Sequence, residues 1–214
     1  MVIVVGGMIG LGKTTLAELL GKELNTEVFY EKVDDNRVLK QFYTASQEEV
    51  EQKRYPFLLQ IEFLLSRFNS IKQALHNDNN ILDRSIYEDK YFASRLHERG
   101  DISDLEYELY CDMFDTLMCE VENIPKQRPD LMIYLRGSFD TVLDRIKQRG
   151  RDFEVDDDLV EYYKYIWEGY DEWVATQYNA SPILVVNVDM LDLVNNPTDK
   201  EIVIGMINDK LNEL

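Results

Sequence analysis

One short segment near the N-terminus constrains the fold and chemistry of this chain more than any other. It follows the pattern G-x-x-x-x-G-K-[ST] and consists of Gly7, Met8, Ile9, Gly10, Leu11, Gly12, Lys13 and Thr14. In such a segment the glycines let backbone N–H groups wrap around phosphates, the lysine reaches the β- and γ-phosphates, and the final hydroxyl binds Mg²⁺. The pattern therefore predicts a loop that binds a nucleoside triphosphate.

The residues on either side of this segment agree with that prediction. Residues 2–5 are β-branched and unbroken, as in a buried parallel strand. Residues 15–24 carry leucines at helical spacing, and the N-terminus of that helix would point its positive end at the same anion. We therefore expect a phosphate loop over residues 6–15, with Thr15 included, between a strand and a helix.

The rest of the chain alternates short apolar runs with longer helical patterns. Further strands are expected at residues 28–30, 80–82, 131–135 and 183–188. Further helices are expected at residues 57–75, 102–122, 139–148, 158–178 and 199–211. Strands separated by helices predict an α/β fold with a five-stranded parallel sheet flanked by helices. Since no low-complexity linker interrupts the 214 residues, we expect a single domain over residues 1–214.

The charge of the chain limits the partners that it can bind. There are 41 Asp and Glu residues against 23 Lys and Arg residues, which gives a formal net charge of −18. Nucleic acid and an anionic bilayer each need a basic face, so neither is an expected partner. A small anionic ligand needs only a local cluster of cations. We expect the excess acid on exposed segments such as residues 48–51 and 156–158.

The cysteines and the hydropathy pattern predict a cytoplasmic protein. Cys111 and Cys119 lie eight residues apart, which on one helix is ~12 Å of rise and too far for a disulfide. Free thiols fit a reducing cytosol. No run reaches the ~20 apolar residues that a membrane span needs, and the apolar residues 1–5 lack the basic leader of a signal peptide.

A second group of charged residues follows the predicted strands. Glu31 comes after the second strand, and Asp83 and Arg84 come directly after the third. The carboxyl ends of parallel strands meet at one crevice, so these side chains should lie near Lys13 and Thr14. A carboxylate there can accept the proton of an attacking hydroxyl, and an arginine can stabilise the developing negative charge. Alternatively, Glu31 is a solvated loop acid, and Asp83 and Arg84 form a surface ion pair.

Three arginines form a third group. Arg145 and Arg149 are spaced to share one helix face, Gly150 can end that helix, and Arg151 follows. One interpretation is an arginine-rich lid, at about residues 145–158, that closes over a triphosphate. The other is pairing of these arginines with the acids that follow. Those acids are Asp152, Glu154, Asp156, Asp157 and Asp158.

On the predicted helix at residues 57–75, Gln60 and Arg67 share a face with Phe57 and Phe63. A glutamine and an arginine on an otherwise apolar stripe are costly to bury without partners. They could read the hydrogen-bonding edge of a nucleobase, or the stripe could border solvent.

In this order along the chain, these motifs resemble those of the deoxyribonucleoside kinases. The resemblance covers nearly the whole chain and is best with the bacterial deoxyadenosine/deoxyguanosine kinase branch. It implies a P-loop kinase fold and a homodimer. It also implies that Glu31 is the general base for the sugar 5′-hydroxyl, that Arg84 orients this base, and that Asp83 lies near Mg²⁺. The residues that match the lid arginines of the family are Arg145, Arg149 and Arg151.

The same resemblance implies the residues that bind the deoxynucleoside. Tyr43 and Glu154 match the pair that holds the 3′-hydroxyl. Gln60, Arg67 and Asp89 match the base-reading residues, with an ion pair between Arg67 and Asp89. Residues 189–193 fall where relatives hold the adenine of ATP. The chain departs from many relatives at Lys32, where a proline is usual, at Leu11, where a small residue is usual, and at residues 44–53, which look longer.

We therefore expect a kinase that uses ATP and Mg²⁺ to phosphorylate the 5′-hydroxyl of a 2′-deoxynucleoside in nucleotide salvage. The resemblance implies a purine substrate, deoxyadenosine first and deoxyguanosine second. A nucleoside monophosphate kinase of the thymidylate kinase type is an alternative, but Glu31 would repel its acceptor. A P-loop ATPase switch is another, but it would not need Gln60, Arg67 and Asp89. No Asn-Lys-x-Asp element is present to read guanine in a GTPase.

Overall fold

The computed structural model describes residues 1–31, 33, 35–124, 126–154, 156 and 159–214. Lys32, Asp157 and Asp158, which entered the sequence analysis, lie outside these residues, as does position 155 of the predicted lid. Within the described chain, five strands form one sheet in the order β2-β3-β1-β4-β5, and every pair is parallel. The strands are β1 (Val2–Gly7), β2 (Glu27–Phe29), β3 (Asn80–Asp83), β4 (Leu131–Arg136) and β5 (Ile183–Asn187). The predicted five-stranded parallel sheet is confirmed.

Strand β1 lies at the centre of the sheet and is buried along its whole length. Its end lies between Asp83 of β3 and Leu135 of β4, because Val5 pairs with Asp83 and Gly7 pairs with Leu135. The strand order reverses direction at this point, from β3 on one side of β1 to β4 on the other. In open α/β sheets such a reversal opens a crevice at the carboxyl ends of the strands, where ligands bind.

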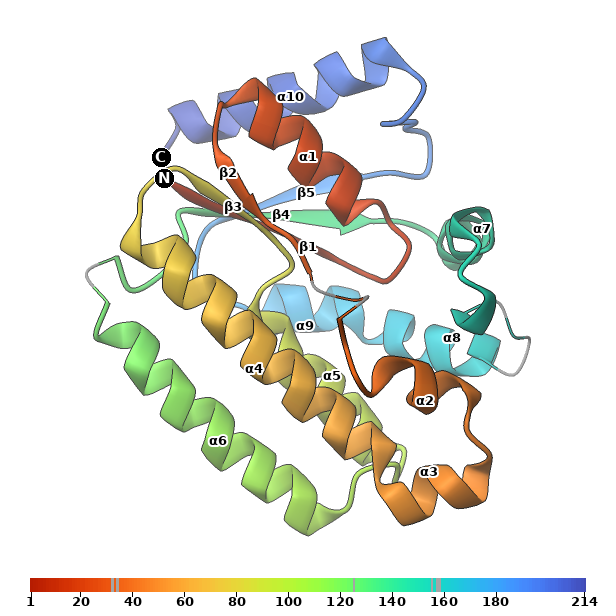
Figure 1. The fold of residues 1–214 in the computed structure, drawn as a ribbon. Helices are drawn as coiled ribbons and strands as arrows, with labels where there is room; N and C mark the ends of the chain where they lie inside the picture. Colours follow the sequence, from red (N-terminus) through yellow and green to blue (C-terminus); the bar gives the residue numbers. More distant parts are fainter. Residues whose placement is uncertain (32, 34, 125, 155, 157–158) are drawn as a thin grey trace.

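Helices cover both faces of this sheet (Figure 1). Helices α1 (Lys13–Glu23) and α10 (Pro197–Asn212) lie over one face. The other face is covered by α4 (Tyr55–His76), α5 (Asp89–Glu98) and α9 (Tyr170–Thr176), and α6 (Asp104–Glu122) lies beside α4. Helices α2 (Leu39–Thr44), α7 (Phe139–Arg149) and α8 (Val160–Glu168) surround the end of the sheet where β1 opens into the phosphate loop.

The helix predicted over residues 158–178 is wrong as a single element. Among the described residues it is two helices, α8 and α9, separated at Gly169. A side-chain carbon at Gly169 would lie only 3.0 Å from the Tyr91 hydroxyl of α5. Glycine therefore allows α5 to pack closely here, and it also favours a break because it is a poor helix former.

Among the described residues, three α-helices were not anticipated from the sequence: α2, α3 (Gln47–Lys53) and α5. For α3 a local signal was available, since Ser46 and Glu49 form a capping box in which the Ser46 hydroxyl accepts from the Glu49 N–H at 3.3 Å. At α7 the predicted ends are confirmed. The Ser138 hydroxyl accepts from the Thr141 N–H at 3.3 Å, and Gly150 ends the helix with a φ of 67°.

The structure also shows the state of the cysteines, the exposure of the acidic segment at residues 48–51 and the hydropathy of the helices. Both cysteines lie on α6 as free thiols. Glu48, Glu49 and Glu51 are exposed. Within the part of the chain that the structure describes, no helix has the length and apolar character needed to cross a membrane.

Candidate active site

The phosphate loop runs directly from β1 into α1. Gly10 and Gly12 have φ values of 86° and 92°, which side chains rarely allow. A side-chain carbon at Gly10 would also lie 2.9 Å from Ile146, so α7 packs against the loop here. No side chain caps the N-terminus of α1, where Gly12 is the capping residue. The backbone N–H groups at this end therefore suit an anion.

Lys13 and Thr14 open α1 and face the centre of the crevice. The Lys13 ammonium donates to the carbonyl of Met8 at 3.0 Å, and only 7% of the residue is exposed. Burial, followed by the nearby charge of Arg84, lowers the pKa of Lys13 to about 7, although Glu31 and other carboxylates act in the opposite direction. Lys13 is therefore a buried cation whose charged form a phosphate group would stabilise.

Thr14 and Asp83 form the candidate magnesium site. The Thr14 hydroxyl donates to Asp83 Oδ2 at 2.6 Å, while the buried Oδ1 has no hydrogen-bond partner. Burial raises the pKa of Asp83, as does the charge of Glu31. A hydroxyl and a carboxylate with an unpartnered oxygen fit Mg²⁺, which binds oxygen and takes its remaining ligands from water and phosphate. Across the described residues, no group of three or more His, Cys, Asp or Glu side chains is placed to hold a metal ion.

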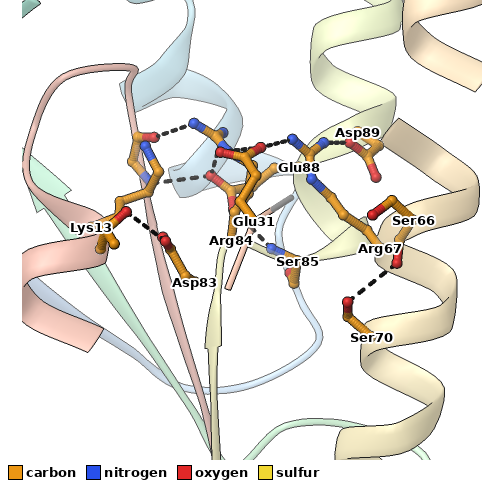
Figure 2. A network of polar contacts seen from close by, with 12 residues as sticks. Lys13, Glu31, Ser66, Arg67, Ser70, Asp83, Arg84, Ser85, Glu88 and Asp89 are labelled. Carbon is orange, nitrogen blue, oxygen red and sulfur yellow. Dashed lines mark hydrogen bonds and ion pairs between the residues drawn. The ribbon is translucent and has the colours of Figure 1, made fainter. Parts of the chain in front are cut away.

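Glu31 lies between two guanidinium groups, as Figure 2 shows. Arg67 donates a hydrogen bond to it, and Arg84 Nε lies 3.4 Å from Glu31 Oε1. Burial alone would raise the pKa of Glu31, but Arg67, Arg84 and Lys13 outweigh it and lower the pKa to about 2. The side chain is 18% exposed, so Glu31 is an ionised carboxylate inside the crevice rather than a solvated loop acid.

Arg67 joins Glu31 to Asp89 on the other side (Figure 2). The ion pair between Arg67 and Asp89 was expected, and the structure contains it. The Arg67 guanidinium also lies 4.4 Å from the centroid of the Phe63 ring, which adds a cation–π contact. Arg67 therefore links the proposed base-reading residues to the carboxylate at the centre of the crevice.

Arg84 is buried rather than part of a surface ion pair. Its backbone has a φ of 68°, its guanidinium donates to Glu88 Oε1 and to the carbonyl of Gly7, each at 3.1 Å, and it also contacts Tyr170 at 3.3 Å. Neither Glu88 nor Tyr170 was expected at this site from the sequence. For Glu88 a signal existed, because Ser85-x-x-Glu88 follows a capping pattern, and Glu88 accepts from the Ser85 N–H at 3.3 Å. For Tyr170 no local pattern was available.

A pocket opens beside Glu31. Together with the open solvent at its mouth, the space in this pocket is about 590 Å³. Gln60 is 2% exposed there, and its side-chain oxygen has no hydrogen-bond partner. Six of the seven predicted substrate-binding residues line this pocket: Glu31, Tyr43, Gln60, Arg67, Arg84 and Glu154. Asp89, the seventh, pairs with Arg67 but does not line the wall.

A second, larger cleft of about 1920 Å³, including its open side, adjoins the pocket. It is lined by loop residues that include Gly12, by Thr15, and by the segment around Asp189 that follows β5. Four charged residues line both cavities: Lys13, Glu31, Arg149 and Arg151. Lys13 and Glu31 therefore lie where a phosphate chain in the cleft would meet a small molecule in the pocket.

The three clustered arginines are held in different ways. Arg145 donates to the carbonyl of Leu11 at 2.8 Å, and to the carbonyls of Val188 and Leu191 at 2.8 and 2.9 Å. Arg149 and Arg151 instead pair with Glu154, the latter at 3.3 Å. For these two the alternative of pairing with a following acid therefore holds in this structure. The lid at about residues 145–158 remains a prediction.

The chain belongs to the deoxynucleoside kinase family, whose model, described as "Deoxynucleoside kinase", matches residues 3–212. It is 43% identical to a deoxyguanosine kinase and 39% identical to a deoxyadenosine kinase, both from Lactobacillus acidophilus. Both matches cover 100% of this chain, with 92% and 97% of the relatives covered. A solved deoxyadenosine kinase from M. mycoides, with products dCMP and a flexible dCDP bound, superposes with a TM-score of 0.80 at 30% identity. That match covers 98% of this chain and 100% of the other. The protein is therefore a kinase with the P-loop kinase fold, as the motifs predicted.

Proposed function

We propose that this protein transfers the γ-phosphoryl group of ATP to the 5′-hydroxyl of a 2′-deoxynucleoside. The observation that carries the proposal is the position of Glu31. Its ionised carboxylate lines both the pocket of the predicted substrate-binding residues and the cleft of the phosphate loop. A hydroxyl that enters the pocket beside Glu31 would therefore face the terminal phosphate of a nucleotide held by Lys13.

On the donor side, the loop backbone, the N-terminus of α1 and Lys13 bind the phosphates. The Thr14 hydroxyl and Asp83 would hold Mg²⁺, which neutralises charge on the β- and γ-phosphates when it is bound. Arg149 and Arg151 line the cleft and can turn from Glu154 to the transferring group. Arg145, Arg149 and Arg151 together form the proposed lid.

On the acceptor side, Glu31 accepts the proton of the 5′-hydroxyl as the hydroxyl oxygen bonds to the γ-phosphorus. The bond from that phosphorus to the bridging oxygen breaks, and ADP leaves. Arg67 and Arg84 keep Glu31 ionised and aimed at the hydroxyl. Phosphoryl transfer is catalysed mainly by electrostatic stabilisation of the transition state. The positioning of these charged groups therefore supplies most of the rate.

The acceptor is a neutral nucleoside rather than a nucleoside monophosphate. Arg67, Arg84 and Glu31 already form ion pairs in the wall of the pocket, and the phosphate of a nucleoside monophosphate there would meet the carboxylate of Glu31 at close range. The test is to assay deoxyadenosine and dAMP separately as acceptors with ATP. We expect turnover with the nucleoside, whereas phosphorylation of dAMP alone would indicate the monophosphate kinase instead.

The preferred substrate is a purine deoxynucleoside, deoxyadenosine before deoxyguanosine. Relatives named deoxyguanosine kinase and deoxyadenosine kinase match the chain over its full length. In the pocket, the unpartnered oxygen of Gln60 and the pair of Arg67 with Asp89 supply donors and acceptors for a base edge. Values of kcat/KM for the four deoxynucleosides with ATP test this order, and a preference for thymidine would contradict it.

The protein acts as a homodimer of one kinase domain per chain, in the cytoplasm. Support for the dimer comes from large exposed apolar side chains on α4 and α6, which lie side by side (Figure 1). Large apolar side chains exposed on neighbouring helices favour an interface with another protein surface. The side chains are Leu58, Leu65, Leu105, Leu109 and Met113. Light scattering after size exclusion should give twice the mass of 25.2 kDa, and Leu109→Glu should give the monomer. A wild-type monomer would contradict this proposal.

A further inference from the structure

Glu88 is a buried carboxylate that none of the roles above requires. It is 0% exposed and ends the short 3₁₀ helix Ile86–Glu88 between β3 and α5. Its Oε1 atom accepts from the Gly7 N–H at 3.0 Å, from Arg84 at 3.1 Å and from the Tyr170 hydroxyl. Its Oε2 atom accepts from the Ser85 N–H at 3.3 Å. Burial of a carboxylate is tolerated only with this degree of pairing.

The donors connect Glu88 to both sides of the active site. Gly7 is the first residue of the phosphate loop, and both of its backbone polar groups are held by one ion pair. Glu88 accepts from its N–H at 3.0 Å, and Arg84 donates to its carbonyl at 3.1 Å. Arg84 in turn reaches Glu31 through Nε at 3.4 Å. A single chain of contacts therefore runs from Tyr170 through Glu88 and Arg84 to Glu31.

The charge of Glu88 matters to this series of contacts as much as the shape of its side chain. The Arg84 guanidinium contacts two carboxylates, Glu88 through Nη1 at 3.1 Å and Glu31 through Nε at 3.4 Å. If Glu88 lost its charge, Glu31 would be the nearest carboxylate left to balance the guanidinium. The stronger pairing would make Glu31 a weaker proton acceptor, because a nearby cation favours the ionised form of a carboxylate.

We propose that Glu88, held in place by the Tyr170 hydroxyl, is a positioning residue for phosphoryl transfer. It fixes Arg84 against the phosphate loop and shares its charge, so that Glu31 can accept the proton of the 5′-hydroxyl. This inference rests on the proposed role of Glu31 as the base. Glu88 and Tyr170 touch neither substrate, and their effect passes through Arg84.

The first experiment measures kcat and both KM values for Glu88→Gln and Tyr170→Phe. Hydrogen bonds to charged groups are worth enough to change a rate by about tenfold or more. We therefore expect kcat to fall at least about tenfold in Glu88→Gln and about threefold to tenfold in Tyr170→Phe, with both KM values within about threefold of wild type.

Tyr134→Phe is the matched control. The Tyr134 ring stacks on Tyr170 with centroids 5.7 Å apart, but its hydroxyl donates to Asp171 at 2.7 Å, away from Glu88. It should keep the wild-type kcat. An equal loss in Tyr134→Phe, or an unchanged kcat in both test variants, would overturn the proposal.

The second experiment repeats both substitutions in a Glu31→Gln background. If Glu88 acts through Arg84 on Glu31, the double variants should have the residual turnover of Glu31→Gln within about twofold, because the two effects share one pathway. A further loss equal to that seen in the wild-type background would show a separate structural role and overturn the inference. Wild-type turnover in Glu31→Gln alone would instead remove the proposed base.

Thermal unfolding of each variant completes the test. The kcat values count only for variants with a cooperative unfolding transition above the assay temperature. If Glu88→Gln lacks one, Tyr170→Phe decides, because it leaves the ion pair of Glu88 with Arg84 in place. Wild-type kcat in a folded Tyr170→Phe then overturns the proposal, and a loss that disappears in the Glu31→Gln background supports it.

Discussion

The two sides of the crevice hold their cations in opposite ways. On the donor side, Lys13 donates to the carbonyl of Met8, and Arg145 donates to three backbone carbonyls. On the acceptor side, arginines are paired with carboxylates inside the protein. The arginines paired in this way are Arg67 and Arg84. Arg149 and Arg151, which line both cavities, pair with Glu154.

This difference matches the charge of the two substrates. The charge of a cation that binds neutral carbonyls is not balanced by a carboxylate, so an incoming phosphate can balance it, whereas a cation paired with a carboxylate presents a polar wall of little net charge. ATP is highly charged and a deoxynucleoside is neutral. The chain as a whole carries a charge of −18. Its binding of ATP therefore depends on the few cations near the phosphate loop that contact backbone carbonyls, such as Lys13 and Arg145.

The largest expected effect is the loss of turnover when the carboxylate on the acceptor side is removed. Glu31→Gln replaces the carboxylate that accepts the hydroxyl proton with a neutral amide. General base catalysis typically raises a rate by about 10²- to 10⁴-fold. We expect kcat to fall by that amount, with the KM for ATP little changed. Glu27→Gln, an exposed substitution on β2, is the control and should keep wild-type turnover. Wild-type kcat in Glu31→Gln would contradict the assignment of the base.

The next effect concerns the donor side and its metal. Thr14→Val removes the hydroxyl that donates to Asp83 at 2.6 Å but keeps the shape of the side chain. We expect a roughly tenfold to hundredfold loss of activity, and a higher Mg²⁺ concentration for half-maximal rate. Thr14→Ser keeps the hydroxyl and should stay near wild type. Equal Mg²⁺ dependence in the two variants would show that Thr14 does not hold the metal.

A smaller effect separates Arg145 from the other clustered arginines. Its three hydrogen bonds join the phosphate loop to the segment after β5, so Arg145→Met should loosen both walls of the ATP cleft. We expect the KM for ATP to rise about tenfold with the KM for the deoxynucleoside unchanged. Lys147→Met, on the exposed face of α7, is the control. A rise in the nucleoside KM alone would contradict this role.

The contrast between these arginines shows how far the sequence can predict the site. The strands and the phosphate loop were predictable, because runs of β-branched residues and the glycine pattern are local. Arg145 and Arg149 share one helix face, yet their partners differ, because the carbonyls that Arg145 binds come from segments far along the chain. Tyr170 was not expected at the site for the same reason, since its contact with Glu88 spans 82 positions.

The smallest expected effect tests the electrostatics of Glu31 through stability. The pKa of Glu31 falls from an ordinary 4.5 to about 2 in the folded protein, because Arg67, Arg84 and Lys13 outweigh the opposing effect of burial. Between these two values the unfolded chain binds a proton that the folded protein does not, so the free energy of unfolding must decrease as the pH falls through this window. Wild type should therefore lose more Tm between pH 5 and pH 3 than Glu31→Gln does, by a few degrees. Glu27→Gln should follow wild type, and parallel curves for wild type and Glu31→Gln would show that the arginines do not hold Glu31 ionised.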